Sequence, residues 1–223
     1  MLFRSDRMRD PVTLNGMVLL AAPAGDYDRR LVLLTTDRGR ITVFANGARR
    51  PGSPLMGTTR TFVFGSFTLR EGRSAYSLIS ASPVCYFEEL GADVEGACMG
   101  SYLTELADYY SRENMEATEL LTLLYQSLKA LSKPAIPNAL IRRIFELRLM
   151  VINGEYTEEP PGEVSESCRY AWQYVTSQPV ARLYQFALTP DVLREFEDAV
   201  EMARHRFLPH ECRALEIMKM MTH

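Results

Sequence analysis

Residues 31–45 read LVLLTTDRGRITVFA, two short apolar runs separated by a polar turn. Apolar and β-branched residues fill both runs, a composition that is typical of strands. Between them, Asp37 and Arg38 lead to Gly39, which we expect to adopt the positive φ that a tight hairpin turn needs. The stretch therefore predicts a β-hairpin.

The same pattern continues on both sides of this hairpin, where turn-forming proline, glycine and aspartate residues separate further apolar runs. The expected strands are residues 12–22, 31–35, 40–45, 61–69 and 75–82. A long loop at residues 47–57 separates the third strand from the fourth. Five short strands within about seventy residues suit a small closed barrel, and an OB-fold is the leading prediction.

Beyond residue 86 the period of the apolar residues changes from two to about 3.6, which indicates helices. Residues 140–152 are apolar on most of their circumference, so we expect them to form the buried central helix. Gly154 is expected as the C′ residue of that helix. Thr189 and Pro190 suit an N-cap and a first-turn proline, and they predict a helix that ends at about residue 208.

The predicted fold class is therefore α+β, an N-terminal five-stranded OB-fold β-barrel followed by an all-α helical domain. We place the first domain at residues 1–83 and the second at residues 84–223. Within the second, residues 154–167 are acidic, contain two prolines and show no periodicity. This segment is expected to be a surface loop that joins two helical halves.

The charged residues divide the chain unevenly. Residues 1–80 contain 12 arginines, no lysine and 6 acidic residues, a net charge of +6, whereas the remainder carries −9. Either the barrel meets a polyanion, or two domains of opposite charge simply neutralise each other. Guanidinium groups suit phosphate oxygens and stack on bases, so the arginines of the barrel are the candidate nucleic-acid contacts. They are Arg29, Arg38, Arg40, Arg49, Arg50, Arg60, Arg70 and Arg73.

Five aromatic residues, Phe44, Phe62, Phe64, Phe67 and Tyr76, alternate with these arginines along the chain. A small barrel must fill its interior, so most of the five are expected in the core. We expect one or two exposed rings on which bases could stack.

Few residues of the chain suit catalysis. Asp26 and Asp28 form a D-x-D motif, but no third carboxylate is expected near them, and a strand-connecting turn is the simpler interpretation. No glycine-rich loop has the spacing that cradles phosphates. The three histidines, His205, His210 and His223, all lie near the C-terminal end. A hydrolase or nuclease is therefore disfavoured, and we predict that the protein is not an enzyme.

The sequence also predicts no cofactor. The spacing of His205, His210 and Cys212 matches no common zinc pattern, and the four cysteines are widely separated, as in reduced cytosolic proteins. The charged first ten residues do not resemble a secretory signal, and no apolar run reaches the length of a membrane span. We expect a cytoplasmic protein with no membrane partner.

Several motifs resemble the RecO family of DNA repair proteins. The opening strands carry GMVL at 16–19, GDYDRRLV at 25–32, LT at 34–35 and GRI at 39–41. The loop ANGARRP at 45–51 resembles the most distinctive loop of the family. The helical segments YLTEL at 102–106 and FELRL at 145–149 are similar to its two helical signatures, and RALE at 213–216 is a fainter match.

The resemblance implies an OB-fold with a helical domain that binds and anneals DNA strands. It also implies three protein partners: RecR, RecA and the single-stranded-DNA-binding protein. The family helps RecA to displace that binding protein from DNA. Two features depart from the family pattern. Only Cys168 stands where many members carry a four-cysteine zinc module, so no zinc is expected, and Asn46 stands where a lysine is usual. The alternative hypothesis is accordingly a protein-interaction adaptor with weak or no DNA binding.

Overall fold

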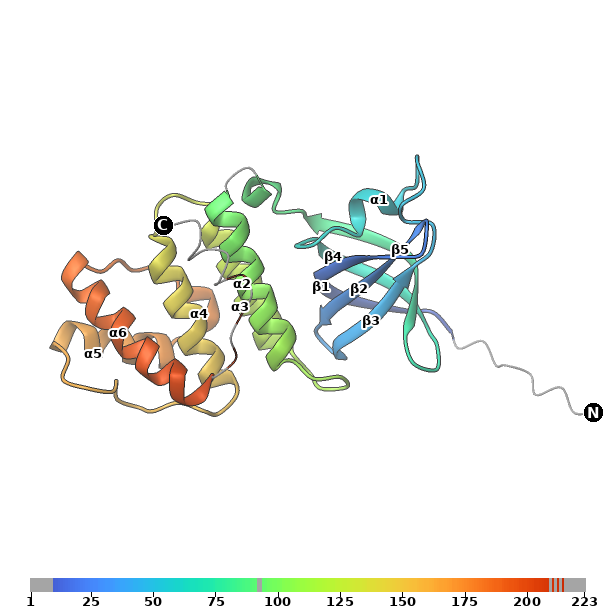
Figure 1. Ribbon diagram of the computed structural model, residues 1–223. Helices are drawn as coiled ribbons and strands as arrows, with labels where there is room; N and C mark the ends of the chain where they lie inside the picture. The colour runs from blue at the N-terminus through green and yellow to red at the C-terminus, as the bar shows by residue number, and fades with distance from the viewer. Residues whose placement is uncertain (1–9, 92–93, 209, 211, 213, 215–223) are drawn as a thin grey trace, which may run out of the picture. The chain divides into compact units, whose positions relative to one another are not determined.

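The computed structural model of the chain describes residues 10–91, 94–208, 210, 212 and 214 (Figure 1). These residues belong to two compact units. The first consists of the residues up to Tyr86 together with Ser111–Ala117, and the second of Phe87–Tyr110 and the residues from Thr118 onward. Strands dominate the first unit and helices the second.

The first unit is a closed barrel of five strands in the order β1-β2-β3-β5-β4. The strands are β1 (Val12–Ala24), β2 (Asp28–Thr35), β3 (Gly39–Ala45), β4 (Phe64–Glu71) and β5 (Tyr76–Cys85). β4 pairs with β1 to close the barrel, and β3 pairs with β5 in parallel. The predicted five-stranded OB-fold barrel is confirmed. A short helix that the sequence did not indicate, α1 (Leu55–Thr58), lies in the long loop between β3 and β4.

The barrel interior is filled by alternate residues of the strands, because successive strand residues face opposite sides of a sheet. Leu31 and Leu33 of β2 lie inside with Val43 of β3, all fully buried. Phe67 of β4 is the largest side chain of this cluster and is also fully buried. Of the five aromatic residues considered in the sequence, only Phe67 is buried. Phe62, Phe64 and Tyr76 are half-buried and Phe44 is exposed, so the expectation that most of the five lie in the core was wrong.

The β2–β3 turn requires glycine for two reasons. Gly39 has a φ of 60°, as predicted, and a Cβ there would lie 2.1 Å from the carbonyl oxygen of Arg112. The close approach arises because the segment Ser111–Ala117 pairs with this hairpin. The backbone N–H of Arg40 donates to that same oxygen at 3.2 Å, and Asn114 donates to the carbonyl of Arg38 at 2.9 Å.

The second unit consists of helices, none of them long and apolar enough among the described residues to cross a membrane. Its α-helices are α2 (Val94–Tyr110), α3 (Thr118–Leu131), α4 (Asn138–Ile152), α5 (Glu166–Ser177) and α6 (Pro190–Phe207), with 3₁₀ turns η1 (Glu88–Gly91) and η2 (Val180–Arg182). α4 packs against α2, α3, α5 and α6, which confirms the predicted central helix.

The predicted helix ends are found where local chemistry specified them. Gly154 has a φ of 71°, and its N–H donates to the carbonyl of Val151 at 3.0 Å while Glu155 donates to Met150 at 2.9 Å. This is the Schellman ending expected of a C′ glycine. α6 begins after Thr189 with Pro190 in its first turn, although the Thr189 side chain makes no capping hydrogen bond.

Residues 154–165 form the expected surface loop between α4 and α5. The indole N–H of Trp172 donates to the carbonyl of Thr157 at 3.0 Å and attaches this loop to α5. Cys168 is buried, and within the described residues it belongs to no group of potential metal ligands. The faint family match at residues 213–216, apart from Ala214, and His223 lie outside the described residues.

A network of buried charges holds the helical unit together. The fully buried carboxylate of Glu146 on α4 accepts hydrogen bonds from the hydroxyl of Tyr102, from Nε of Arg142 at 2.9 Å and from Nη1 of Arg143 at 2.8 Å. Arg143 also donates to Glu201 of α6 at 2.5 Å. Because a charge removed from water must be paired, these partners fix α2, α4 and α6 against one another.

Candidate nucleic-acid interface

A row of exposed residues crosses the outer face of four barrel strands. Arg30 of β2 pairs with Phe44 of β3, Phe44 pairs with Ser77 of β5, and Ser77 pairs with Arg70 of β4. All four residues are exposed, and Phe44 leaves 38% of its surface in solvent. Because neighbouring strands lie about 4.8 Å apart, Phe44 is one strand from Arg30 and two strands from Arg70. We call these four residues the Arg–Phe row.

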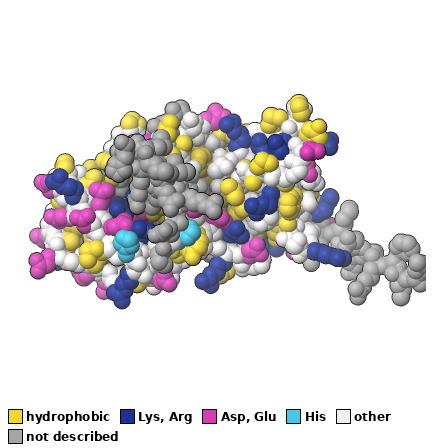
Figure 2. All heavy atoms as spheres, in the orientation of Figure 1, with side chains coloured by type: hydrophobic (Ala, Val, Ile, Leu, Met, Phe, Trp, Pro, Cys, Tyr) yellow, Lys and Arg dark blue, Asp and Glu magenta, His cyan; other side chains and the backbone are white. Residues whose placement is uncertain are grey.

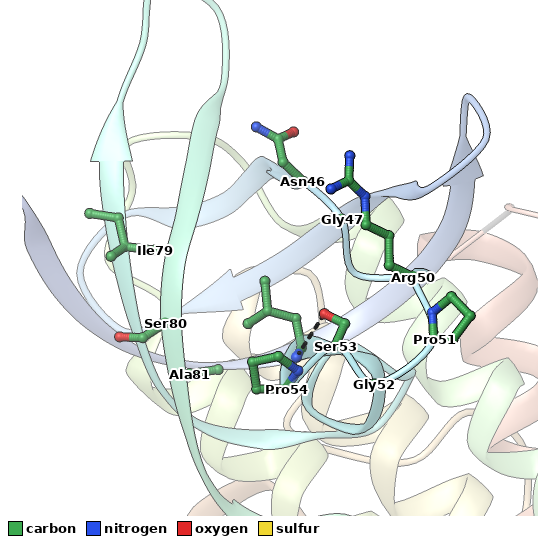
Figure 3. A pocket seen from close by; sticks show the side chains of 11 residues that line it. Asn46, Gly47, Arg50, Pro51, Gly52, Ser53, Pro54, Ile79, Ser80 and Ala81 are labelled. Carbon is green, nitrogen blue, oxygen red and sulfur yellow. Dashed lines mark hydrogen bonds between the residues drawn. The ribbon is translucent and has the colours of Figure 1, made fainter.

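A groove with a volume of about 520 Å³ lies beside the end of β3 (Figure 3). The loop residues Asn46–Gly47 and Arg50–Leu55 form one side, and Ile79–Ala81 of β5 form the other. Leu78 pairs with Leu69 and Ser80 with Thr68, so the intervening Ile79 is an extra residue in a bulge. The bulge turns its apolar side chain outward, where 43% of its surface is exposed.

The groove and the Arg–Phe row lie on the same side of β3. Asn46 follows Phe44 by two residues, and both are exposed whereas Ala45 between them is buried. Strand alternation therefore continues the outer face from Phe44 to the groove. Together they form one candidate binding surface with an aromatic ring, an apolar side chain and several guanidinium groups.

The loop that carries Arg49 and Arg50 is attached to the β1–β2 turn. The backbone N–H of Arg49 donates to the carbonyl of Tyr27 at 2.8 Å, and its Nη1 donates to the carbonyl of Gly25 at 3.1 Å. The guanidinium carbon of Arg50 lies 5.4 Å from the centre of the Tyr27 ring, a cation–π arrangement. Both arginines nonetheless remain exposed, and a half-exposed tyrosine lies beside them.

Arg29 is half-buried, and its guanidinium group is bound to the α1 segment and the residue after it. Its Nη1 donates to the carbonyl of Met56 at 2.8 Å and to the hydroxyl of Thr59 at 2.9 Å, so it orders the α1 segment. Burial, followed by the positive charges of Arg49 and Arg60, lowers the pKa of Arg29. The positive charges of Arg49 and Arg60 thus both act against that of Arg29, and a bound anion would relieve this repulsion.

The other predicted arginines lie elsewhere on the barrel. Arg38 in the β2–β3 turn donates to the hydroxyl of Tyr76 at 3.2 Å and lies 3.7 Å from a carboxylate oxygen of Glu71, which partly neutralises it. Arg73 is exposed in the β4–β5 turn, and the half-buried Arg40 is the second residue of β3. The eight arginines chosen from the sequence therefore form no single cluster.

The sequence interpretation missed Arg30 and Tyr27 as members of this surface. The available signal for Arg30 was strand alternation, since Leu31 and Leu33 face the interior and Arg30 must face outward. Of the acidic pair, Asp28 has a structural role: its carboxylate accepts a hydrogen bond from the N–H of Gly47 at 2.7 Å. Within the described part of the barrel, no group of His, Cys, Asp or Glu has the geometry of a metal site.

Charge is distributed on the surface as the sequence indicated. Figure 2 shows dark blue Lys and Arg side chains over the barrel and more of the magenta Asp and Glu side chains over the helical unit. The candidate surface is therefore a basic face with stacking and apolar elements. Single-stranded nucleic acid, which combines phosphates with unpaired bases, has the complementary chemistry.

Comparison with known proteins points to one family. The family model described as "Recombination protein O N terminal" matches residues 8–87, and "Recombination protein O C terminal" matches residues 92–159. The chain is 34% identical over 143 residues to the DNA repair protein RecO of Alkaliphilus metalliredigens, covering 64% of the chain and 58% of that protein. It is 35% identical over 138 residues to the protein of the same name from Desulforudis audaxviator, covering 62% and 55%. The match thus spans less than two thirds of these relatives.

Proposed function

Because the chain belongs to the RecO family of DNA repair proteins, we propose that it binds single-stranded DNA on the outer face of its barrel. The Arg–Phe row is the observation that carries this proposal. An exposed ring between cationic positions lets a base stack while the guanidinium groups contact the phosphates on either side. Neither contact depends on base identity, so the binding is expected to be independent of sequence.

The loop end of the barrel extends this surface in our proposal. Arg49, Arg50 and Arg60 are exposed there, and the strand's phosphates would relieve their repulsion with Arg29. We assign phosphate contacts to the exposed arginines and give Arg29 the role of holding the loop in place. Arg38 lies in the β2–β3 turn and Arg40 directly after it, and both would contact a strand that continues past the Arg–Phe row.

The wider role that we propose is that of a non-enzymatic recombination mediator. It would promote annealing of complementary strands and, together with RecR, help load RecA onto DNA covered by the single-stranded-DNA-binding protein. Such work requires strands to be bound and released without breaking a covalent bond. Contacts to phosphates and base faces suit it, because they leave the hydrogen-bonding edges of the bases available for pairing.

The test is a salt titration of binding to a labelled single-stranded oligonucleotide. Each lost phosphate contact reduces the slope of log affinity against log salt by about 0.7 for single strands. The double variant Arg49→Ala, Arg50→Ala should therefore flatten the slope by about 1.4. Its melting temperature should stay near that of the parent, because both side chains are exposed.

A matched control removes the same charge from the helical unit. The double variant Arg169→Ala, Arg194→Ala deletes two surface arginines that already pair with Glu159 and Asp191. It should leave the slope unchanged. Equal slopes in the two double variants would contradict the proposal, since the effect would then follow net charge alone.

The competing function is the protein-interaction adaptor. It is favoured by the internal engagement of Arg29 and Arg38, which removes two of the eight candidate cations from easy contact with DNA. An adaptor predicts that the parent protein shows no salt-dependent binding of single strands while still capturing RecR. The same titration therefore separates the two functions.

A further inference from the structure

Three potential metal ligands meet in the helical unit, well away in sequence from the place of the family's cysteine module. Glu105 lies on α2, and His210 and Cys212 lie in the segment that follows α6. One carboxylate oxygen, one imidazole nitrogen and the thiol sulfur lie within 4.8 Å of one another. Among the described residues this is the one group with such geometry.

From the sequence, the spacing of His205, His210 and Cys212 matched no zinc pattern and no metal was expected; the structure brings a different residue to His210 and Cys212. His205 is mostly exposed on α6, where its Nε2 lies 3.2 Å from a carboxylate oxygen of Glu201. It therefore lies against Glu201 on its own helix and is not part of the group around His210 and Cys212. Glu105, which lies more than a hundred residues earlier in the chain, replaces it beside His210 and Cys212.

Neighbouring groups orient two of the three ligands. The Tyr109 ring stacks on the imidazole of His210, with 3.8 Å between ring centres and 14° between ring planes. The backbone N–H of Ala214 donates to Oε2 of Glu105 at 3.2 Å, while Oε1 lies 3.8 Å from Nε2 of His210. Such outer contacts are what hold ligands in a metal site, because they fix the ring plane and the carboxylate direction.

The mixture of donor atoms selects the metal. Calcium and magnesium prefer oxygen ligands alone, whereas zinc accepts nitrogen, sulfur and carboxylate oxygen in one tetrahedral site. Zinc bonds of about 2.0–2.3 Å would place the ligand atoms about 3.3–3.8 Å apart. The three atoms would thus draw together by roughly 1 Å, which half-buried side chains such as Glu105 and His210 allow.

We propose that Glu105, His210 and Cys212 bind a zinc ion, with water as the fourth ligand, and that the ion fastens the segment after α6 to α2. Since α2 lies more than a hundred residues away, the ion would stabilise the folded state by a long-range link. The site would be part of the helical unit, so it is independent of DNA binding by the barrel.

Cobalt provides the probe, because Co²⁺ takes the same tetrahedral ligands and absorbs light when bound to a thiolate. The purified full chain is stripped with chelator, titrated with Co²⁺ and then with Zn²⁺. We expect about one Co²⁺ per chain, a thiolate-to-cobalt charge-transfer band, and loss of the spectrum when zinc displaces cobalt. Absence of that band in the parent would overturn the proposal.

Variants then assign the ligands. Cys212→Ser should abolish the charge-transfer band, and Glu105→Gln should weaken cobalt binding by at least about 100-fold. Glu105 is half-buried, so its variant should keep the fold, which the fluorescence of Trp172 reports. Matched controls are Cys98→Ser, which changes the cysteine of α2, and His205→Gln. Both should bind cobalt like the parent, and a band that survives Cys212→Ser would refute the site.

Discussion

The barrel and the helical unit use arginine in opposite ways. In the barrel, Arg49 and Arg60 are exposed, and with Arg29 they form a group whose charges repel. In the helical unit, Arg143 and Arg204 donate to glutamates that are buried or half-buried. The first arrangement leaves positive charge for an external anion, whereas the second uses it to hold helices together.

The difference shows that net charge is a poor guide to a binding surface. Many arginines of the helical unit are paired with carboxylates within it, as Arg142, Arg148 and Arg204 are with glutamates. In the barrel, Arg30 and Arg70 have no ion-pair partner among the described residues, and the exposed ring of Phe44 lies in the same row of paired strand positions. The following predictions test this contrast, beginning with the largest effect.

The largest effect is expected from Glu146→Gln in the helical network. The change leaves Arg142 and Arg143 without the buried charge that pairs them, and breaking a buried ion pair costs about 3–5 kcal/mol. Urea unfolding followed by Trp172 fluorescence measures this loss. Trp172 is the single tryptophan of the chain and is buried in the helical unit, so the signal reports that unit alone.

The control for this variant is Glu159→Gln, which removes the partner of Arg169 on the surface. Exposed pairs contribute about 0–1 kcal/mol, so the unfolding midpoint should hardly move. If the two substitutions had equal effects, the helical network would be no more important than a surface contact, and the contrast with the barrel would disappear.

Features that depend on local chemistry could be predicted from the sequence. Gly39, Gly154 and Thr189 were assigned correctly because a turn, a helix C-terminus and a helix N-terminus each impose their own backbone requirement. The barrel followed from period-two runs and turn residues, and the central helix from its apolar circumference. Each of these signals extends over a few neighbouring residues, so it can be read without knowing which distant residues pack against them.

Features that depend on pairing between distant residues could not be predicted. The Arg–Phe row depends on the register of four strands, and a shift of one residue would turn each side chain to the other face. The pairing of Ser111–Ala117 with the β2–β3 hairpin, and the meeting of Glu105 with Cys212, join segments that no periodicity connects. The arginines were selected by residue type and domain alone, so the sequence could not predict which of them would be paired within the fold and which would be exposed.

The second prediction concerns stacking on the barrel. Phe44→Ala should weaken binding of single-stranded DNA by about 1–3 kcal/mol, the contribution of one stacked base. The salt slope should change little, because no phosphate contact is lost. Tyr86→Ala, which removes an exposed aromatic side chain of the same unit outside the Arg–Phe row, is the control and should bind like the parent. Equal losses in both variants would remove Phe44 from the interface.

The third prediction uses acid to weaken the helical network. Burial alone would raise the pKa of Glu201, but hydrogen bonds from Arg204 and Arg143 outweigh it and lower the pKa to about 2. A carboxylate with a lowered pKa stabilises the folded state fully above its ordinary pKa of 4.5 and loses that contribution as pH falls toward 2. Solvent screening limits the effect to about 1 kcal/mol.

The measurement compares the unfolding midpoint of the parent and Glu201→Gln between neutral pH and pH 3. The variant should be less stable than the parent at neutral pH. The difference should shrink between pH 4.5 and pH 3, because there the unfolded chain binds a proton at Glu201 whereas the folded protein still holds the carboxylate ionised. A difference that stays constant across this range would show that the carboxylate charge contributes nothing to the network.

The smallest effect compares a paired and an unpaired arginine within the barrel itself. Arg30 is exposed in the Arg–Phe row and has no acidic partner among the described residues, whereas Arg38 lies 3.7 Å from Glu71. Arg30→Ala should reduce the salt slope by about 0.7, equivalent to roughly threefold in affinity between 50 and 200 mM salt. Arg38→Ala should change it less, because Glu71 already neutralises part of its charge. In a Glu71→Gln background, Arg38→Ala should reduce the salt slope more than it does in the parent, because Arg38 no longer pairs with Glu71 and can contact phosphate. Slopes that are equal for Arg30→Ala and Arg38→Ala would mean that internal pairing does not decide which arginines meet DNA.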